Sequence, residues 1–369
     1  MKTWVLHRIG DLQLEDRPTP RISDGEVLVE VKMAGICGSD ISRIFKTEAH
    51  VYPLIPGHEF AGVVVETGKN TERWKNKRVS IFPLVPCYKC DQCKNNRYEM
   101  CCCYDYIGSR RNGGFAQYVV VPEWNLIEIP DAISMEQAAL MEPMAVAAHA
   151  IRRAGVHPKN SIAVCGLGTI GLFIVMFLRE MGCENIFGIG KKKIQKELFK
   201  RIGVADKKYI CIKNRNVDEA ILSATNGLGV DMFFECVGKN ETISLGLKCT
   251  AASGCIQLVG NPMDDIVLLR NIYWKILRKQ LTVLGTWNSS FTHELNDDWH
   301  YVLNRLECGA IHPERMITHK YNLSKLDEGV VLIRDKKEEY VKVMINNYLI
   351  DDNKNEEPLF SVKVKSIVT

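Results

Sequence analysis

The chain has 369 residues, of which 46% are hydrophobic and 25% charged, so it is long enough for about two soluble globular domains. Its 48 basic and 44 acidic residues leave a net charge of only +4, which provides no strong field for nucleic acid or a membrane surface. Residues 1–14 lack the apolar centre of a signal peptide, and no apolar run is long enough to cross a bilayer. We therefore expect a cytoplasmic protein without nucleic-acid or membrane partners, whose fourteen cysteines bind metal or remain free thiols.

The first 125 residues carry short β-branched and aromatic runs separated by Gly and Pro, which is typical of an antiparallel, barrel-like β domain. An alanine-rich segment at 131–155 then favours helix and indicates a domain boundary. From Ser161 to about residue 286, apolar strands alternate with amphipathic helices, which predicts a parallel sheet wrapped by helices. We expect the chain then to return to the first domain, which gives domains at 1–145, 146–285 and 286–345. A tail at 346–369 ends in an alternating, strand-like segment at 360–368, to which we assign no role.

Four cysteines within a short segment are spaced for a closed zinc site: Cys87, Cys90, Cys93 and Cys101. A loop with two residues between each of the first three thiols and seven before the fourth can present four thiolates tetrahedrally to one ion. Such a site has no position left for substrate. Buried or disulfide-bonded cysteines are the alternative, and Cys102 and Cys103 fall outside the spacing.

Gly166, Gly168 and Gly171 form a GxGxxG pattern directly after an apolar run at 161–165. In a dinucleotide-binding domain the first glycine allows a tight turn, the second lets the backbone approach a pyrophosphate, and the third lets helix and strand pack closely. Thr169 and Ile170 open the helix whose free amides would bind the phosphates. Glycines that only shape a turn are the alternative.

The next strand, at 185–189, ends where such a domain normally offers a carboxylate to the ribose 2′-hydroxyl of the cofactor. Gly190 takes that position here and is followed by Lys191, Lys192 and Lys193. Without a carboxylate nothing repels a 2′-phosphate, and lysines can pair with one. We therefore expect the chain to tolerate or prefer NADP, with a solvated lysine run as the alternative.

A second group of metal-ligating residues is scattered along the chain, as catalytic metal sites usually are. Its members are Cys37 in CGSD, His58 and Glu59 in GHE, and Glu142 in MEP. A thiolate, an imidazole and a carboxylate from separate segments can hold zinc while one position stays open to water or substrate. Taken singly, each of these residues is more often structural.

Five motifs in this order resemble the zinc-containing medium-chain alcohol and polyol dehydrogenases. They are CGSD at 37–40, PGHEF at 56–60, the four-cysteine loop, GGFAQY at 113–118 and GLGTIG at 166–171. The resemblance extends from Met1 to about Ile345. Three stretches outside these motifs are most similar to the galactitol-1-phosphate 5-dehydrogenases within that family: 43–53, 104–115 and 275–287.

The resemblance implies an α/β fold in which a GroES-like, β-rich catalytic domain is interrupted by a Rossmann domain with a doubly wound parallel sheet. It also implies two zinc ions per chain, NAD or NADP as cofactor, an active site between the domains, and a homodimer or homotetramer. The family's catalytic-zinc ligands fall on Cys37, His58 and Glu142, with Glu59 bound directly or through water. The structural ion falls on the four-cysteine loop.

The family mechanism assigns further roles. Zinc polarises a substrate hydroxyl, Ser39 receives its proton, and hydride passes to the nicotinamide. The alternative role for Ser39 is to cap the helix that follows. Better-known alcohol dehydrogenases end the proton relay on a histidine where this chain has Ser42, which leaves the proton's exit route open. The segment YVKVMI at 340–345 lacks the glycine that usually precedes its lysine, and we expect this departure not to touch the chemistry.

A sugar-phosphate substrate requires cations near the catalytic zinc. The candidates are Arg43 and Lys46 after CGSD, and Arg110 and Arg111 before Gly113. Exposed surface charges are the alternative for each. The sequence thus predicts oxidation of a secondary hydroxyl of a sugar-alcohol phosphate, galactitol 1-phosphate to tagatose 6-phosphate, with a small-molecule substrate as the partner.

Three other functions remain open at this point. A dehydrogenase of an unphosphorylated polyol or an amino alcohol, such as sorbitol or threonine, shares the zinc and nucleotide motifs. A zinc-ribbon nucleic-acid-binding protein is disfavoured by the balanced charge and by the absence of a basic and aromatic patch. A catalytically silent NAD(P)-binding regulator is disfavoured because all four catalytic-zinc candidates are present.

Overall fold

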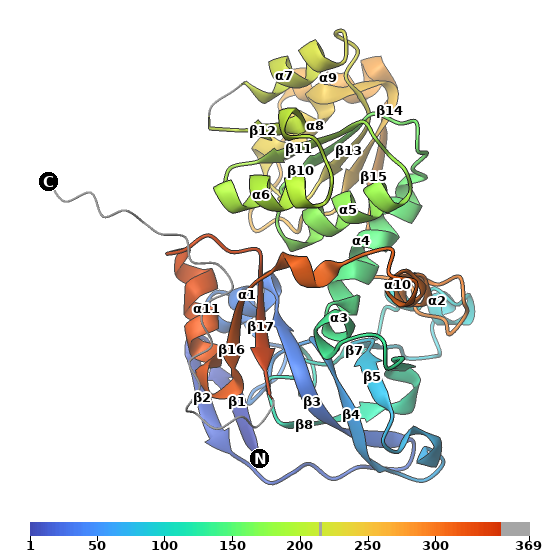
Figure 1. Ribbon diagram of the computed structural model, residues 1–369, viewed down its shortest axis with the longest axis vertical. Coiled ribbons are helices and arrows are strands. Elements are labelled where there is room, and N and C mark those ends of the chain that lie inside the picture. The colour runs from blue at the N-terminus through green and yellow to red at the C-terminus, as the bar shows by residue number, and fades with distance from the viewer. Residues whose placement is uncertain (214–215, 348–369) are drawn as a thin grey trace, which may run out of the picture.

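The computed structural model describes residues 1–213 and 216–347, and it consists of two lobes (Figure 1). We call the lower lobe in Figure 1 the β-rich domain and the upper lobe the parallel-sheet domain. The predicted tail at 346–369 lies outside the described residues, apart from its first two positions.

The β-rich domain is built around one sheet of seven strands. Its strands follow the order β16-β17-β3-β4-β5-β9, and β8 also pairs with β3. β17 runs antiparallel to β3, so the chain returns to this sheet after it has completed the other domain. The strands of the domain are β1 (Lys2–Arg8), β2 (Asp11–Asp16), β3 (Glu26–Ile36), β4 (Glu59–Thr67), β5 (Arg78–Ile81), β6 (Leu84–Val85), β7 (Asp105–Tyr106), β8 (Tyr118–Pro122), β9 (Leu126–Glu128), β16 (Ile317–Asn322) and β17 (Lys342–Asn346).

The other domain contains a parallel sheet with the strand order β12-β11-β10-β13-β14-β15. Counted from its own first strand, this is the 3-2-1-4-5-6 order of a Rossmann fold, so the predicted doubly wound sheet is confirmed. Its strands are β10 (Ile162–Cys165), β11 (Ile186–Gly190), β12 (Tyr209–Cys211), β13 (Val230–Glu235), β14 (Thr250–Leu258) and β15 (Thr282–Gly285). Its helices are α5 (Thr169–Glu180), α6 (Lys193–Arg201), α7 (Val217–Ala224), α8 (Asn240–Cys249) and α9 (Arg270–Lys279).

The alanine-rich segment forms two helices that join the domains. α3 (Met135–Ala139) begins at a capping box made by Ser134 and Gln137, and α4 (Met141–Ala154) follows after Leu140. α4 packs against α5 and against α10 (Asp298–Glu307). The remaining helices are α1 (Gly38–Phe45), α2 (Asp91–Lys94) and α11 (Leu326–Asp335).

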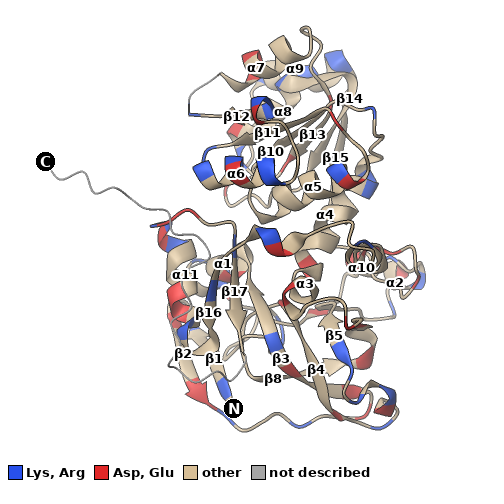
Figure 2. Ribbon diagram, viewed as in Figure 1, with Lys and Arg blue, Asp and Glu red and all other residues tan. Residues whose placement is uncertain are grey.

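Charges of both signs are interspersed over both domains, in keeping with the small net charge (Figure 2). Across residues 1–213 and 216–347, no helix combines the length and the apolar character that a bilayer crossing requires.

One hydrophobic cluster is shared by the two domains, and Trp299 on α10 lies within it. Trp299 is fully buried, its Nε1 donates a hydrogen bond to Oγ of Ser289 at 3.0 Å, and its ring meets that of Phe82 edge-on at 5.6 Å.

We predict that Trp299→Ala lowers the free energy of unfolding by about 3–5 kcal/mol, because it leaves a large cavity. Urea unfolding measures this loss. Leu228→Ala is the control, since Leu228 is 73% exposed, and an equal loss in both variants would contradict the prediction.

Candidate active site and zinc centres

The cysteine loop brings its four spaced thiols into one group. The Sγ atom of Cys93 lies 3.9 Å from that of Cys87 and 3.5 Å from that of Cys90, and Cys90 and Cys101 are 3.9 Å apart. A tetrahedral site with Zn–S bonds of about 2.3 Å requires S–S separations of about 3.8 Å. The thiols are too far apart for disulfides and are all free, so their arrangement fits a closed zinc site.

Neighbouring backbone groups change the pKa of a thiol in this loop, and two further cysteines lie outside the group of four. Backbone N–H groups of Cys93 and Cys102 donate to Cys90 and lower the pKa of its thiol to about 5, which favours the thiolate that a metal binds. The side chains of Cys102 and Cys103 are exposed, and their Sγ atoms lie 3.7 Å from each other. Neither belongs to the group of four.

Strand pairing assembles the second metal group. Cys37 directly follows β3, while His58 and Glu59 lie at the start of β4. Because β3 and β4 pair antiparallel with Gly35 opposite Glu59, the three side chains meet at the same end of the sheet. Their ligand atoms all lie within 4.8 Å of one another. A thiolate, an imidazole and a carboxylate so placed form a suitable donor set for zinc.

Asp40 supports this group from behind. It is fully buried and accepts hydrogen bonds from the backbone N–H of Cys37 and from Nη1 of Arg43, both at 3.0 Å. Its Oδ1 also lies 3.3 Å from Nδ1 of His58. A carboxylate beside one ring nitrogen orients a histidine and leaves the other nitrogen for a metal.

Glu142, the fourth predicted member, lies outside the group of three. Its Oε1 accepts a hydrogen bond from the hydroxyl of Tyr106 at 3.4 Å, and the Tyr106 ring lies 5.9 Å from the ring of His58. Burial raises the pKa of Glu142 to about 7, so a nearby cation is needed to keep it fully ionised at neutral pH. Tyr106 was not predicted as a site residue, although it lies in the stretch at 104–115 that marks the subfamily resemblance.

Lys342, in the YVKVMI segment, lies beside the second metal group. This lysine is 2% exposed, pairs with the carboxylate of Glu59, and donates a hydrogen bond to the carbonyl oxygen of Ile36 at 3.2 Å. Gly35 makes room for the pair, because a Cβ there would lie 2.2 Å from Oε2 of Glu59 and 2.8 Å from Cε of Lys342. No local pattern indicates this contact, since Glu59 and Lys342 are far apart along the chain.

Ser39 and Ser42, the two serines that follow Cys37, lie on α1. Cys37 is the N-cap of the helix, so the alternative role of Ser39 as its cap is wrong. Ser39 is exposed at the second helical position. Ser42 contacts Sδ of Met263 in the parallel-sheet domain at 3.9 Å, so α1 faces that domain.

Two of the four predicted phosphate-binding residues are linked to the second metal group through neighbouring side chains. Arg43 is held by Asp40, and the guanidinium of Arg110 lies over the ring of Tyr104, 4.3 Å from its centroid. Tyr104 in turn packs against Tyr106, with ring centroids 6.1 Å apart. His50, which was not predicted, lies close to both arginines: burial lowers its pKa, and the positive charges of Arg110 and Arg43 lower it further.

The other two candidates are placed differently. Arg111 is bonded to Oε1 of Glu26, at the start of β3, at 3.2 Å, and lies 3.9 Å from Asp105. Its charge is therefore neutralised near the end of β3 that is remote from Cys37. Lys46 is exposed directly after α1.

The glycine-rich turn between β10 and α5 has the features needed to bind a dinucleotide. Gly166 has φ +95°, and a Cβ there would lie 2.6 Å from Val237. A Cβ on Gly171 would lie 2.1 Å from the carbonyl oxygen of Gly166, whereas Gly168 has open space before it. Thr169 and Ile170 begin α5. The turn thus leaves the start of the helix open to a phosphate group.

The end of β11 differs from the usual pattern for a physical reason. A Cβ on Gly190 would lie 2.8 Å from the hydroxyl of Tyr209 and 2.9 Å from Oε1 of Gln195, so a side chain there would have to displace the ends of both side chains. Gln195 Oε1 also accepts the backbone N–H groups of Lys191 and Lys192 at 3.0 and 3.1 Å. The start of α6 is therefore rigid and carries no carboxylate of its own at this position.

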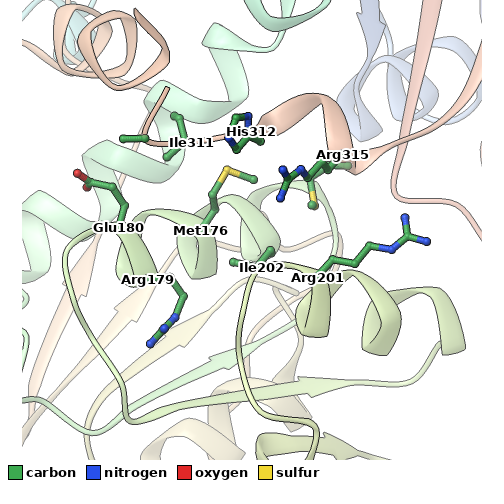
Figure 3. A pocket seen from close by; sticks show the side chains of 10 residues that line it. Met176, Arg179, Glu180, Arg201, Ile202, Ile311, His312 and Arg315 are labelled. Carbon is green, nitrogen blue, oxygen red and sulfur yellow. The ribbon is translucent and has the colours of Figure 1, made fainter. Parts of the chain in front are cut away.

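A cavity of about 260 Å³ lies elsewhere, at the C-terminal end of α5 (Figure 3). Figure 3 shows His312 and Arg315 on one side of it and Met176 and Ile202 on the other. It contains none of the predicted site residues. The residues that line it are Met176, Arg179, Glu180, Arg201, Ile202, Ala310, Ile311, His312, Arg315 and Met316.

Comparisons with known proteins agree with this architecture. Residues 23–131 match the alcohol dehydrogenase GroES-like domain, and residues 169–307 match the zinc-binding dehydrogenase family. Galactitol 1-phosphate 5-dehydrogenase of Escherichia coli K12 is 30% identical over 339 residues, which are 89% of this chain and 95% of that protein. The chain belongs to the zinc-containing medium-chain alcohol and polyol dehydrogenases. It is therefore a zinc-dependent oxidoreductase that uses a nicotinamide cofactor.

Other relatives act on different substrates. D-arabitol-phosphate dehydrogenase of Enterococcus avium is 31% identical, covering 90% of this chain and 93% of that protein. Sorbitol dehydrogenase of Bacillus subtilis is 28% identical, with coverages of 94% and 97%. The family therefore includes enzymes for both phosphorylated and free polyols.

Solved structures of relatives contain either cofactor. A zinc-binding dehydrogenase of Sinorhizobium meliloti bound to NADP superposes with a TM-score of 0.86 at 27% identity, covering 94% of this chain and 99% of that one. An alcohol dehydrogenase of E. coli CFT073 complexed with NADH superposes with a TM-score of 0.85 at 26% identity, with the same coverages.

Metal analysis tests the separation into two zinc centres. We predict two zinc ions per chain in the parent protein, one for each group of ligands. Cys93→Ser should retain one and should unfold at a lower temperature, because a structural zinc contributes directly to folding. Cys102→Ser is the matched control and should retain both ions. A control variant that also loses zinc would show that the ligand assignment is wrong.

The buried pair of Glu59 and Lys342 makes a second prediction. Lys342→Met leaves a buried carboxylate without its counter-charge, so we expect it to lower the free energy of unfolding by about 3–5 kcal/mol. Adding Glu59→Gln to this variant should restore part of the loss, because the unpaired charge is then removed. Chemical denaturation of both variants in metal-free buffer measures the difference. A single variant as stable as the parent would contradict the prediction.

Proposed function

We propose that the enzyme oxidises a secondary hydroxyl of a sugar-alcohol phosphate, galactitol 1-phosphate to tagatose 6-phosphate, and transfers the hydride to NAD or NADP. The observation that carries this proposal is the position of Arg43 and Arg110, which both lie close to His50. Arg43 is linked to the second metal group through Asp40, and Arg110 through the rings of Tyr104 and Tyr106. A phosphate dianion needs such charge-assisted donors, and a free polyol does not. Two relatives at about 30% identity act on polyol phosphates.

The proposed roles of the residues follow from their positions. Zinc bound by Cys37, His58 and Glu59 or Glu142 would lower the pKa of the substrate hydroxyl. Ser39, exposed on the first turn of α1, receives the released proton. Tyr106 holds Glu142 by its hydroxyl, and Lys342 holds Glu59, so each carboxylate has a partner when it is not on the metal. The structural ion belongs to the four-cysteine loop.

The cofactor site is proposed at the glycine-rich turn and at the end of β11. Gly166, Gly168, Thr169, Ile170 and Gly171 approach the pyrophosphate at the start of α5. The ribose lies beside Gly190 and Lys191, where the lysines favour tolerance of, or preference for, NADP. Comparing kcat/KM for the two cofactors tests this preference, and a strong NAD preference would remove it.

A side-by-side assay tests the substrate. Galactitol 1-phosphate and free galactitol are supplied at equal concentration, and reduced cofactor is followed by absorbance with and without a chelator. The proposal expects turnover of the phosphate ester alone, and loss of turnover with the chelator. Equal or better turnover of galactitol, sorbitol or threonine supports instead the second candidate, a dehydrogenase of unphosphorylated polyols or amino alcohols, which the sorbitol dehydrogenase relative favours.

Neighbouring arginines provide a matched pair of variants for this proposal. Arg110→Ala should raise KM for galactitol 1-phosphate at least about tenfold, because one charge-assisted hydrogen bond is lost. Arg111→Ala should leave KM unchanged, since its guanidinium is bonded to Glu26. Initial rates with phosphorylated and free polyols measure both effects. The prediction is wrong if the two variants behave alike.

A homodimer is the assembly that we propose, with pairing of two such dimers giving the homotetramer. β15 pairs with β14 and forms the edge of the parallel sheet within the described part of the chain. The exposed apolar side chains on β15 and around it are Tyr273, Trp274, Leu277, Val283 and Trp287. An unpaired apolar edge strand is self-complementary about a two-fold axis, because two copies can join their sheets.

A charge on this edge tests the assembly. Val283→Lys should yield monomers in size-exclusion chromatography with light scattering, since two lysines would face each other across the axis. Leu228→Lys, on an exposed loop away from β15, should elute like the parent. Circular dichroism must show both variants folded. A Val283→Lys protein that remains a dimer removes this interface.

Two further assignments are part of the proposal. The β-rich domain comprises residues 1–145 and 286–345, and the parallel-sheet domain comprises residues 146–285. The compartment is the cytoplasm, because four thiols held for zinc require reducing conditions.

A further inference from the structure

The β-rich domain contacts the start of α6 through Glu339, in the segment between α11 and β17. Its Oε1 accepts a hydrogen bond from the backbone N–H of Lys193 at 3.1 Å, and its Oε2 accepts one from Ile194 at 2.9 Å. These are the first two residues of α6. Free N–H groups at a helix start attract an anion, and here a carboxylate from the other domain occupies both.

The residues after Glu339 continue along the same face of the parallel-sheet domain. The carbonyl oxygen of Tyr340 accepts a hydrogen bond from Nζ of Lys192 at 3.4 Å, and that Nζ lies 4.3 Å from the centroid of the Tyr340 ring. The carbonyl oxygen of Val341 accepts a hydrogen bond from Oγ1 of Thr169 at 2.8 Å. The segment therefore runs from the start of α6 to the start of α5, the two places where the proposed cofactor site would bind phosphate groups.

The end of β11 has no acidic residue of its own, so the carboxylate of Glu339 is relevant to the choice of cofactor. In most Rossmann domains the acidic residue that selects NAD follows the second strand. Gly190 stands there, and the hydroxyl of Tyr209 and the amide oxygen of Gln195 occupy the space that a side chain at this position would take. Glu339 instead supplies a carboxylate to the start of α6, where it accepts hydrogen bonds from Lys193 and Ile194, three and four residues after Gly190.

We propose that Glu339 is a specificity-determining residue that disfavours NADP, acting against the attraction of the neighbouring lysines. The inference rests on the proposed cofactor site. A 2′-phosphate at the start of α6 must displace this carboxylate or lie beside a like charge, whereas the neutral 2′-hydroxyl of NAD meets no such repulsion. Because Glu339 belongs to the β-rich domain, cofactor choice is set by a contact between the domains.

Isothermal titration of NAD⁺ and NADP⁺ into the zinc-loaded enzyme, without substrate, tests the proposal by binding alone. Glu339→Gln keeps the side-chain length and one acceptor oxygen but removes the charge. It should lower the Kd for NADP⁺ about tenfold and change the Kd for NAD⁺ less than about threefold. Glu338→Gln is the matched control, because Glu338 is its exposed neighbour and lies 3.5 Å from His319. It should leave both Kd values unchanged.

Three results would overturn the proposal. Neither Kd value changes in Glu339→Gln; both Kd values shift alike, which would identify a structural helix cap; or Glu338→Gln shifts the ratio as much. Lys191→Ala separates failure of this inference from failure of the proposed cofactor site. If the site is right, Lys191→Ala weakens NADP⁺ binding even where Glu339→Gln has no effect. If neither variant changes either Kd, the site itself is misplaced.

Discussion

The pairing of β3 with β4 on one side and β17 on the other is the constraint on which the active site depends. It places residues from three distant segments at one end of a sheet: Cys37 after β3, Glu59 at the start of β4 and Lys342 at the start of β17. The pairing register sets Gly35 opposite both Glu59 and Met344, so the ion pair of Glu59 and Lys342 crosses the central strand where no side chain intervenes. A one-residue slip would turn these groups to the other face of the sheet.

This arrangement gathers more negative than positive charge in a buried place. Four groups are anionic when ionised, namely Cys37, Asp40, Glu59 and Glu142, while Arg43 and Lys342 are the cations bonded to the carboxylates. A divalent cation would balance the difference, which is a physical reason for the donor set to take up zinc. Burial also raises the pKa of Glu142 to about 7, so a cation beside it would keep this carboxylate ionised.

Sequence reasoning succeeded where the determining residues are close together in the chain. The four-cysteine loop, the glycine-rich turn and the alternation of strands and helices are local patterns, and the parallel sheet followed from them. It missed contacts made across the fold. Lys342 and Tyr106 lie in stretches noted in the sequence, at 340–345 and 104–115, but the role of each depends on a partner more than 30 residues away. The cap role for Ser39 failed because Cys37 already takes that position.

The contacts that link Arg43 and Arg110 to the metal group limit how the proposed phosphate could be bound. Arg43 neutralises the buried Asp40, which also lies against His58, so a phosphate that took Arg43 fully would loosen the support of a zinc ligand. Arg110 does not support a zinc ligand in this way, because its partners are the carbonyl oxygen and the ring of Tyr104. Under the proposed function, we therefore expect discrimination between phosphorylated and free polyols to depend mainly on Arg110 and His50. Both lie in the stretches, 43–53 and 104–115, whose sequence lies outside the motifs common to the family.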